Sequence, residues 1–316
     1  MSKVIHVAAG VIKDAAGQIL IARRPDTAHQ GGLWEFPGGK LEAGESAPQA
    51  LARELHEELG IHVEHCEPLI QIRHDYPDKS VLLDVWTVDA FAGEPHGREG
   101  QPVRWVAASD LGNYDFPAAN VPIVTAARLP KLLAISAPTE DQTSFCRNIH
   151  SAIDKGAALI QVRQPGWGVE QWLEGLEAAA NICRQRQARL VLNSPPSVVL
   201  ERCADVIAGI HLSAVHLQND GKDWRKIQPG WLSYSCHNPE EIRQAEQLGA
   251  DFITLSPVMP TSTHPQAEAL GWDVFAQWVG SAKIPVYALG GMDPGALLSA
   301  INSGAQGVAG ISLFAD

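Results

Sequence analysis

The chain has 316 residues, of which 45% are hydrophobic and 19% charged, a composition typical of folded globular proteins, and its length suggests two domains. Lys and Arg number 24 against 36 Asp and Glu, so the formal net charge is −12. This acidic balance argues against a surface for long nucleic acid, whose phosphates require clustered cations. It leaves open acidic clusters that bind a divalent cation.

Cysteine usage and hydropathy bear on the compartment. The five cysteines lie far apart and form no CxxC pair, which argues against a disulfide framework or a zinc ribbon. We expect reduced, mostly buried thiols in a cytoplasmic protein. No run approaches 18 apolar residues, and the apolar stretch 4–12 leads directly into Lys13 and Asp14. That stretch predicts a first strand, and neither a signal peptide nor a membrane span.

Secondary-structure patterns divide the chain near residue 130. The first part has one clear helix and strand-like runs at residues 4–12, 19–22, 81–91 and 103–106. The second part alternates helical stretches with eight short apolar strands, the pattern of a (β/α)₈ barrel, at residues 132–136, 159–163, 190–192, 209–213, 232–236, 252–256, 286–289 and 307–312. We therefore expect an α/β protein with domains at residues 1–130 and 131–316.

The segment 38–61, GGKLEAGESAPQALARELHEELGI, is the most densely functional part of the sequence. Ser46 and Gln49 form a capping-box pattern, and Gly60 suits a left-handed helix stop. These signals predict a helix over residues 47–59.

Three carboxylates share one face of that helix, because Glu54, Glu57 and Glu58 are spaced i, i+3 and i+4. Like charges this close repel one another unless something neutralises them, and a hard cation such as Mg²⁺ does so with oxygen ligands. The alternative is a solvated acidic helix face. His56 points to a different face, where we expect a surface residue.

The spacing around these glutamates resembles the signature of the Nudix hydrolases: Gly39, five residues, Glu45, seven residues, Arg53-Glu54-Leu55, one residue, Glu57-Glu58, one residue, Gly60-Ile61. The resemblance implies a Nudix α/β/α sandwich that hydrolyses a nucleoside diphosphate linked to another moiety, by attack of water at phosphorus. The glycine pair would let a backbone carbonyl approach a metal, and we expect Arg53 to pair with Glu45.

Segments outside this signature resemble the MutT-type 8-oxo-dGTP diphosphatases: RRPDTAH at 23–29, WEFPGGK at 34–40, GEP at 93–95, REGQP at 98–102 and DFPAANVP at 115–122. This resemblance implies a small-molecule nucleotide substrate, 8-oxo-dGTP, cleaved at the β-phosphorus to 8-oxo-dGMP and pyrophosphate. That activity removes oxidised nucleotides from the pool and so serves DNA repair.

The same resemblance implies roles for individual residues. Mg²⁺, with Mn²⁺ as the alternative, would be bound by Glu54, Glu57, Glu58 and the carbonyl of Gly38, and Glu99 would be a further ligand or a base.

The oxidised purine would be read by a separate set. Asn120 would form hydrogen bonds with its edge, since an amide donates and accepts in one plane, helped by Phe36 and Arg24; the alternative is a loop Asn that caps a turn. Lys79 stands where this family often has Arg, so a bidentate donor is replaced by a point charge.

The barrel segments resemble the thiamine phosphate synthase/TenI family in GAALIQVRQ at 156–164, ADVIAGIHLS at 204–213, YSCHNPEEI at 234–242, GADFITLSPVMPTSTH at 249–264, IPVYALGGM at 284–292 and GAQGVAGISLF at 304–314. The resemblance implies a thiazole or thiamine phosphate ligand. Gly290, Gly291 and residues 309–312 would expose N–H groups to its phosphate, which Gln161 and Arg163 would contact. The alternative for the glycine pair is a plain tight turn.

Departures from the synthase pattern argue against synthase activity. The synthases carry Asn-Asp where this chain has Asn193-Ser194, and a second Asp follows their HL strand where this chain reads HLSAVHL. Both Mg²⁺-binding carboxylates are therefore missing. Two family lysines are replaced by Pro165 and His264, and a pyrophosphate leaving group needs such charges.

His237 stands where TenI-type thiazole tautomerases keep an acid/base histidine, a residue suited to proton transfer. The barrel could thus be a tautomerase-like enzyme, a residual synthase or a non-catalytic phosphate-ligand sensor. If both halves serve thiamine metabolism, the first would hydrolyse a thiamine-related diphosphate. Because the chain ends soon after the eighth strand, we expect no full final barrel helix, and a homo-oligomer that covers this face stays open.

Overall fold

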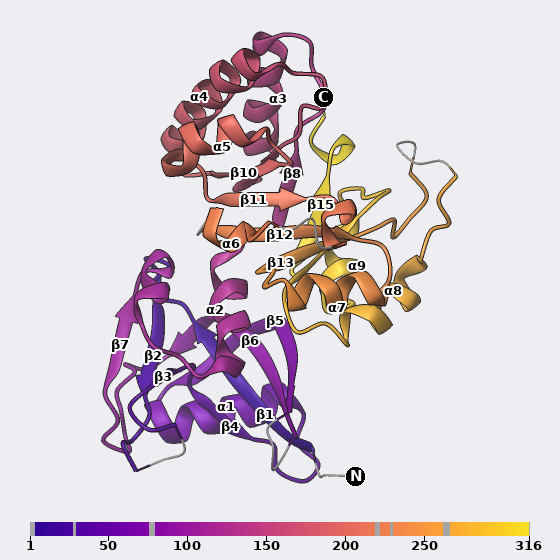
Figure 1. The fold of residues 1–316 in the computed structure, drawn as a ribbon. Coiled ribbons are helices and arrows are strands. Elements are labelled where there is room, and N and C mark those ends of the chain that lie inside the picture. Colours follow the sequence, from indigo (N-terminus) through magenta and orange to yellow (C-terminus); the bar gives the residue numbers. More distant parts are fainter. Residues whose placement is uncertain are drawn as a thin grey trace. The chain divides into compact units, whose positions relative to one another are not determined.

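The computed structural model describes residues 4–27, 30–75, 80–218, 222–227, 230–261 and 266–315. It divides into two compact units, Met1–Arg128 and Leu129–Asp316, coloured indigo to magenta and magenta to yellow in Figure 1. Among the described residues, no helix is both long and apolar enough to cross a bilayer.

The first unit has a four-stranded sheet in the order β4-β1-β6-β5 and a three-stranded sheet in the order β3-β2-β7. Strand β1 runs parallel to β6 and antiparallel to β4. The strands are β1 (Val4–Ile12), β2 (Ile19–Arg23), β3 (Trp34–Glu35), β4 (Gly38–Lys40), β5 (His62–Asp75), β6 (Ser80–Ala92) and β7 (Val103–Val106). The helices are α1 (Ala47–Leu59) and α2 (Val121–Arg128), with 3₁₀ turns at Ala108–Asn113 and Ala118–Asn120.

Helices cover this sheet assembly from two sides. Leu51 and Leu55 of α1 pack in one apolar cluster with Ala8 and Ile12 of β1. A second cluster joins Ile123 of α2 to other residues of β1, β5 and β6. The arrangement of helix, sheets and helix is the predicted α/β/α sandwich.

Strand β5 was not predicted, although it is the longest strand of the unit, with 14 residues. Its sequence, HVEHCEPLIQIRHD, carries Pro68 and lacks a regular alternation of apolar and polar residues. The ladder with β6 is interrupted by register shifts, one of them between Pro68 and Ile70, so no uniform period of two exists to be read.

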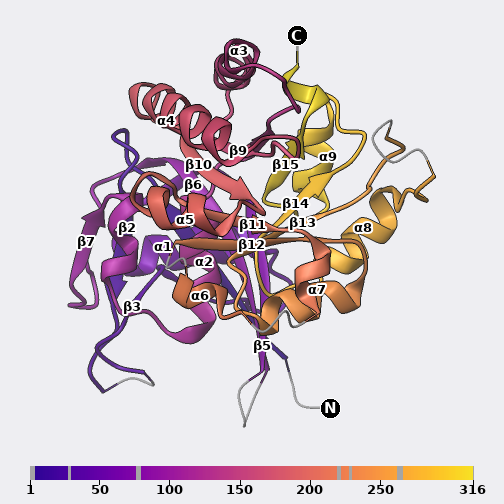
Figure 2. The same cartoon turned by 45° about the horizontal axis from the view of Figure 1, so that its top comes forward.

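The second unit is a closed barrel of eight parallel strands, which confirms the predicted (β/α)₈ architecture. The strands are β8 (Leu132–Ile135), β9 (Leu159–Val162), β10 (Arg189–Asn193), β11 (Gly209–Leu212), β12 (Trp231–Cys236), β13 (Phe252–Leu255), β14 (Val286–Leu289) and β15 (Gly307–Gly310). The helices lie outside them (Figure 2): α3 (Gln142–Asp154), α4 (Val169–Gln185), α5 (Ser197–Cys203), α6 (Trp224–Ile227), α7 (Pro239–Gln247), α8 (Gly271–Val279) and α9 (Ala296–Asn302).

The interior of the barrel changes character along the strands. Residues early in the strands form an apolar cluster that includes Leu159, Val191, Phe252 and Tyr287. Buried residues later in the strands are polar and uncharged, namely Gln161, His211, Ser233 and Thr254. The carboxyl ends of the strands therefore carry hydrogen-bonding groups, as is usual for functional sites in such barrels.

All five cysteines are free, as predicted for reduced thiols. Cys183 and Cys236 are buried, whereas the other three are half-buried. The expectation of mostly buried thiols was thus wrong for these three.

Candidate active sites

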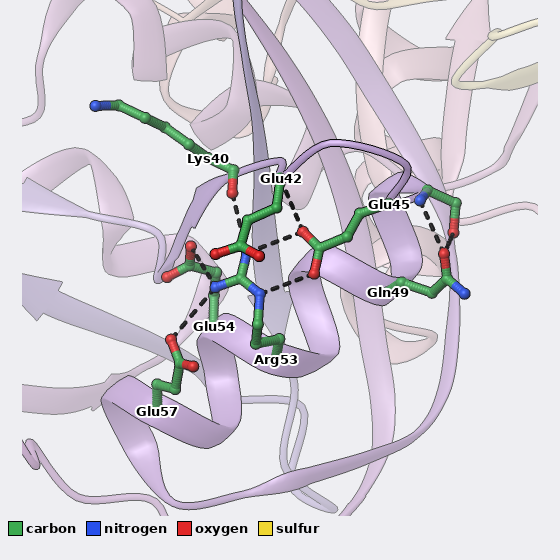
Figure 3. A network of polar contacts seen from close by, with 8 residues as sticks. Lys40, Glu42, Glu45, Gln49, Arg53, Glu54 and Glu57 are labelled. Atoms are coloured by element: carbon green, nitrogen blue, oxygen red, sulfur yellow. Dashed lines mark hydrogen bonds and ion pairs between the residues drawn. The ribbon is translucent and has the colours of Figure 1, made fainter.

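Arg53 of α1 organises the carboxylates of the first unit (Figure 3). Its Nε and Nη2 donate to the two carboxylate oxygens of Glu45 at 2.8 and 3.0 Å, which confirms the predicted pair. Its Nη1 donates to Glu54 Oε1 at 3.0 Å and to Glu57 Oε2 at 3.3 Å. The forked guanidinium thereby ties the loop before α1 to the helix, and its hydrogen bonds lower the pKa of Glu45 to about 2.

The start of α1 follows the predicted signals. Gln49 Oε1 accepts from the backbone N–H of Ser46 at 2.9 Å, and Gly60 ends the helix with φ 73° and ψ 20°. His56 is exposed and stacks on His62, with ring centroids 4.4 Å apart, so the surface prediction for His56 is confirmed.

Two glycines bring strand β4 against β1 and α1. A Cβ atom at Gly39 would lie 2.1 Å from the carboxyl carbon of Glu54, and one at Gly38 would lie 2.1 Å from the carbonyl oxygen of Ala8. Gly38 also has φ 147°, a conformation that favours glycine. Its N–H donates to Glu58 Oε2 at 3.2 Å. The start of β4 thus lies against the side chain of Glu54 and donates a backbone N–H to Glu58.

Glu58 is half-buried and lies near other carboxylates. Burial raises its pKa to about 7, and the charges of Glu35, Glu54 and Glu99 act in the same direction against the opposing hydrogen bond from Gly38. Carboxylates from β3, α1 and the loop after β6 therefore converge on one region.

The loop that carries Glu99 is fixed to the end of α1. The N–H of Arg98 and Nε2 of Gln101 both donate to the carbonyl of Glu58, at 2.9 and 3.1 Å. The N–H of Glu99 donates to Gln101 Oε1 at 2.9 Å. These contacts use the orphan carbonyls of the helix end to hold Glu99 near Glu58.

The predicted metal ligands are not gathered around one point. Within the described ranges, no three His, Cys, Asp or Glu side chains are placed to hold one ion. Arg53 bonds both Glu54 and Glu57, and the side chain of Glu57 is 57% exposed. The donor set still fits Mg²⁺ in its chemistry, because it consists of oxygen atoms and because its charges disfavour one another without a cation.

Of the residues predicted to read the base, Phe36 lies nearest in sequence to the glycine pair, two residues before Gly38. Phe36 is 4% exposed and stacks on Phe116, with ring centroids 5.4 Å apart and an angle of 18° between the planes. Phe116 was missed, and its only signal is its place in the DFP segment. Arg24 pairs with Glu35, and burial of Glu35 raises the pKa of that carboxyl.

Asn120 is half-buried at the end of the 3₁₀ turn Ala118–Asn120. Its backbone N–H donates to the carbonyl of Pro117 at 2.8 Å. Lys79 lies outside the described residues, and so does His264.

The barrel contains a cavity of about 1160 Å³ at the carboxyl ends of its strands. The predicted ligand-binding residues line it together, namely Gln161, Arg163, His237, Gly290 and Gly291. Among the described residues, no Asp or Glu lines the cavity, and Arg163 is the one lining side chain with a permanent charge. The cavity therefore favours an anion without a coordinated cation.

At Gly290 and Gly291 the backbone passes close to residues 257–260, so this glycine pair is more than a tight turn. Their φ angles are 94° and 68°, and a Cβ atom at Gly291 would lie 2.5 Å from the carbonyl oxygen of Pro260. Only glycine fits this corner of the cavity wall without strain.

His237 is held by Glu241, a residue missed from sequence. Glu241 Oε2 lies 2.7 Å from the backbone nitrogen of His237 and 2.9 Å from its Nδ1. A carboxylate accepts, so Nδ1 carries the proton, and Nε2 of the neutral ring has a free lone pair. The available signal was Glu241 four residues after His237, in the first turn of α7, which Asn238 caps.

His211 was also missed. It lines the cavity at 1% exposure, with Nδ1 2.9 Å from Ser233 Oγ and Nε2 2.8 Å from Ser235 Oγ. Burial lowers its pKa to about 3, so the ring is neutral at physiological pH. The sequence around His211 in β11 carries no pattern that distinguishes a cavity histidine from a histidine of the core, which is why it was missed.

Two family models match the chain: the NUDIX domain over residues 8–126 and thiamine monophosphate synthase over residues 132–314. The first unit is 41% identical over 130 residues to an 8-oxo-dGTP diphosphatase of Escherichia coli, a match that covers 41% of this chain and 99% of the relative. The chain belongs to both families. We call its parts the Nudix unit and the TenI unit.

Further relatives extend each match. The Nudix unit is 38% identical over 124 residues to a CTP pyrophosphohydrolase of E. coli, covering 39% of this chain and 91% of the relative. The TenI unit is 30% identical over 189 residues to a putative thiamine-phosphate synthase 2 of Aquifex aeolicus, covering 60% of this chain and 99% of the relative. Both units therefore correspond to nearly whole proteins elsewhere.

Proposed function

We propose that the Nudix unit hydrolyses 8-oxo-dGTP to 8-oxo-dGMP and pyrophosphate. The observation that carries this proposal is the negative charge that Glu54 and Glu99 exert on Glu58 next to Gly38 and Gly39, in a unit 41% identical to an 8-oxo-dGTP diphosphatase. Clearing this nucleotide would serve sanitation of the nucleotide pool. The five free thiols support a cytoplasmic location.

Hydrolysis would depend on a divalent cation held by Glu54, Glu57, Glu58, Glu99 and the carbonyl of Gly38. Mg²⁺, or Mn²⁺ in its place, neutralises phosphate charge and makes phosphorus more open to attack by water. Arg53 keeps the loop before α1 against the helix, and Gly39 leaves room for the Glu54 carboxylate. The loop after β6 holds Glu99 near Glu58, as a further ligand or as the base that takes a proton from water.

Selection of the oxidised base would rest on a neighbouring set of residues. Asn120 would donate and accept at the purine edge, while the buried Phe36, stacked on the half-buried Phe116, would help to form an apolar wall beside the base. Arg24 is held by Glu35 and would help to fix the base. Lys79 is proposed to contribute a positive charge.

The test is release of pyrophosphate by the full-length protein with Mg²⁺, comparing kcat/KM for 8-oxo-dGTP, dGTP and CTP. We expect a strong preference for 8-oxo-dGTP and loss of turnover in Glu54→Gln. A preference for CTP would favour the activity that the second E. coli relative is named for. Faster release of orthophosphate from thiamine diphosphate would instead overturn the assignment and place both units in thiamine metabolism.

For the TenI unit we propose a thiazole or thiamine phosphate ligand and proton transfer by His237. The observation that favours this second function is the orientation of His237 by Glu241 at a cavity whose described lining residues include Arg163 and no carboxylate. Arg163 and the N–H groups at Gly290 and Gly291 would bind the phosphate, and Nε2 of His237 would move the proton. Mg²⁺-dependent displacement of pyrophosphate finds no supporting carboxylate among the lining residues that the structure describes.

Substituting His237→Asn separates catalysis from sensing. We expect isomerisation of a thiazole phosphate to disappear while the ligand still binds. If the wild-type protein binds the ligand without converting it, the TenI unit is a phosphate-ligand sensor.

A further inference from the structure

The loop after β6 caps the carboxyl end of α1 through several backbone groups. The carbonyl of Glu58 accepts the N–H of Arg98 at 2.9 Å, and the carbonyl of Leu59 accepts the N–H of His96 at 3.2 Å. The carbonyl of His56 accepts Nη1 of Arg98 at 2.9 Å. Because the last carbonyls of a helix have no partner further along it, this loop satisfies groups that the helix leaves open.

Gln101 adds a contact of a different kind, because its side chain binds the helix and the loop together. Its Nε2 donates to the carbonyl of Glu58 at 3.1 Å, and its Oε1 accepts from the N–H of Glu99 at 2.9 Å. These partners fix the orientation of the amide, since a carbonyl only accepts and a backbone N–H only donates. One planar group thus joins the backbone of Glu58 to the backbone of Glu99.

A tight turn brings Gln101 back beside Glu99. The N–H of Gly100 donates to the carbonyl of Gly97 at 3.1 Å, and Gly100 has φ 82°, a conformation that favours glycine. A Cβ atom at Gly97 would lie 1.9 Å from the carbonyl oxygen of Gln101. The close packing of this turn places the half-buried Gln101 where its amide reaches both partners.

The position of Glu99 depends on this turn more than on packing. Glu99 is exposed, so neighbouring side chains do little to fix it. Its own N–H is held by Gln101, and the preceding N–H, of Arg98, is held by the carbonyl of Glu58. Without the amide of Gln101, the backbone at Glu99 loses its link to α1.

We propose that Gln101 is a positioning residue that holds Glu99 beside Glu58 for nucleotide hydrolysis. This inference rests on the function proposed for the Nudix unit. Gln101 acts through Glu99 and touches neither the nucleotide nor the cation. Loss of its amide should therefore slow the step that Glu99 supports and leave binding of the nucleotide nearly unchanged.

A second glutamine supplies a matched control at the other end of the same helix. Gln49 Oε1 accepts from the N–H of Ser46 at 2.9 Å, so Gln49→Ala and Gln101→Ala each remove one side-chain cap of α1. We expect Gln101→Ala to lower kcat for 8-oxo-dGTP roughly 10- to 100-fold, with KM changed less than about twofold. Gln49→Ala should keep kcat even where Tm falls as far. Equal losses of kcat in the two variants would overturn the inference.

A double variant shows whether Gln101 acts through Glu99. Glu99→Gln should itself lower kcat, and Gln101→Ala added to it should have little further effect, because the residue that the amide positions is already lost. Losses that multiply in the double variant would overturn the inference, and so would a wild-type kcat in Glu99→Gln.

Amide hydrogen exchange of the full-length protein tests the contact without nucleotide or cation. The N–H of Glu99 should exchange about fivefold or more faster in Gln101→Ala than in the wild type or Gln49→Ala. Equal exchange in all three, with nucleotide hydrolysis present in the wild type, would refute the positioning role alone. Protection lost only in Gln101→Ala, with no nucleotide hydrolysed by the wild type, would instead refute the function proposed for the Nudix unit and, with it, the role of Gln101.

Discussion

The two units place their functional groups in opposite electrostatic surroundings. In the Nudix unit, burial and the negative charges of Glu35, Glu54 and Glu99 raise the pKa of Glu58, and Arg53 bonds three acidic neighbours. In the TenI unit, the described residues that line the cavity include no carboxylate, and a buried histidine stays neutral. Relatives of both units are named for phosphate compounds, yet among the described residues only the Nudix unit has a donor set that calls for a cation.

The largest effect is expected from the helix carboxylates. Glu54→Gln or Glu57→Gln should lower kcat for nucleotide hydrolysis by roughly 10³-fold, because a cation ligand is lost, and should change Tm little. The exposed Glu64 supplies a control, since Glu64→Gln keeps the change in charge but lies outside the site. Wild-type rates in both site variants would contradict the cation-dependent account.

The glycine pair can separate activity from stability. Gly39→Ala should force Glu54 to move and lower kcat by roughly 10²-fold with a small loss of stability. In Gly38→Ala the new Cβ atom would clash with the backbone of Ala8, and φ at position 38 is 147°, so the main effect should be a lower Tm. Thermal denaturation and initial rates measured on both variants check this contrast, and it fails if Gly39→Ala keeps full activity.

The neutral histidine predicts a pH dependence for the TenI unit. The pKa of His211 falls from 6.5 in the unfolded chain to about 3 in the folded one, so below pH 6.5 the unfolded state binds a proton that the folded state does not. This contribution to stability is complete above pH 6.5 and is lost by about 1.4 kcal/mol per pH unit as the pH falls toward 3. Urea denaturation of wild type and His211→Asn from pH 7 to pH 4 measures it; parallel curves would count against a neutral buried ring.

The smallest effect concerns base recognition in the Nudix unit. Asn120→Ala should reduce the ratio of kcat/KM for 8-oxo-dGTP over dGTP by roughly tenfold, since one amide contact is worth about 1–3 kcal/mol. The rate with dGTP should change less. An unchanged ratio would remove Asn120 from the proposed base-reading set.

Features that depend on periodicity or on short, fixed spacing along the chain were predictable from sequence. All eight barrel strands and the helix Ala47–Leu59 follow from apolar runs and capping residues, and the Arg53–Glu45 pair follows from the motif spacing. Strand β5 was missed because its bulges and Pro68 remove the alternation on which strand prediction depends.

Contacts made across the barrel were less predictable. His211 and Ser233 lie on neighbouring strands 22 residues apart, and only the register of β11 with β12 brings them together. Glu241 is close to His237 in sequence, but its role depends on how α7 begins. In both cases the role of the side chain depends on a hydrogen-bond partner that only the fold brings close: Ser233 for His211, and His237 for Glu241.

The most direct test of the contrast is one titration of the full-length protein with a chelator. Release of pyrophosphate from 8-oxo-dGTP and binding of thiamine phosphate are measured in the same samples as Mg²⁺ is removed. The account predicts that hydrolysis stops and returns when Mg²⁺ is restored, while thiamine phosphate binds with unchanged affinity throughout. Hydrolysis that survives removal of the cation, or binding that disappears with it, would contradict the account.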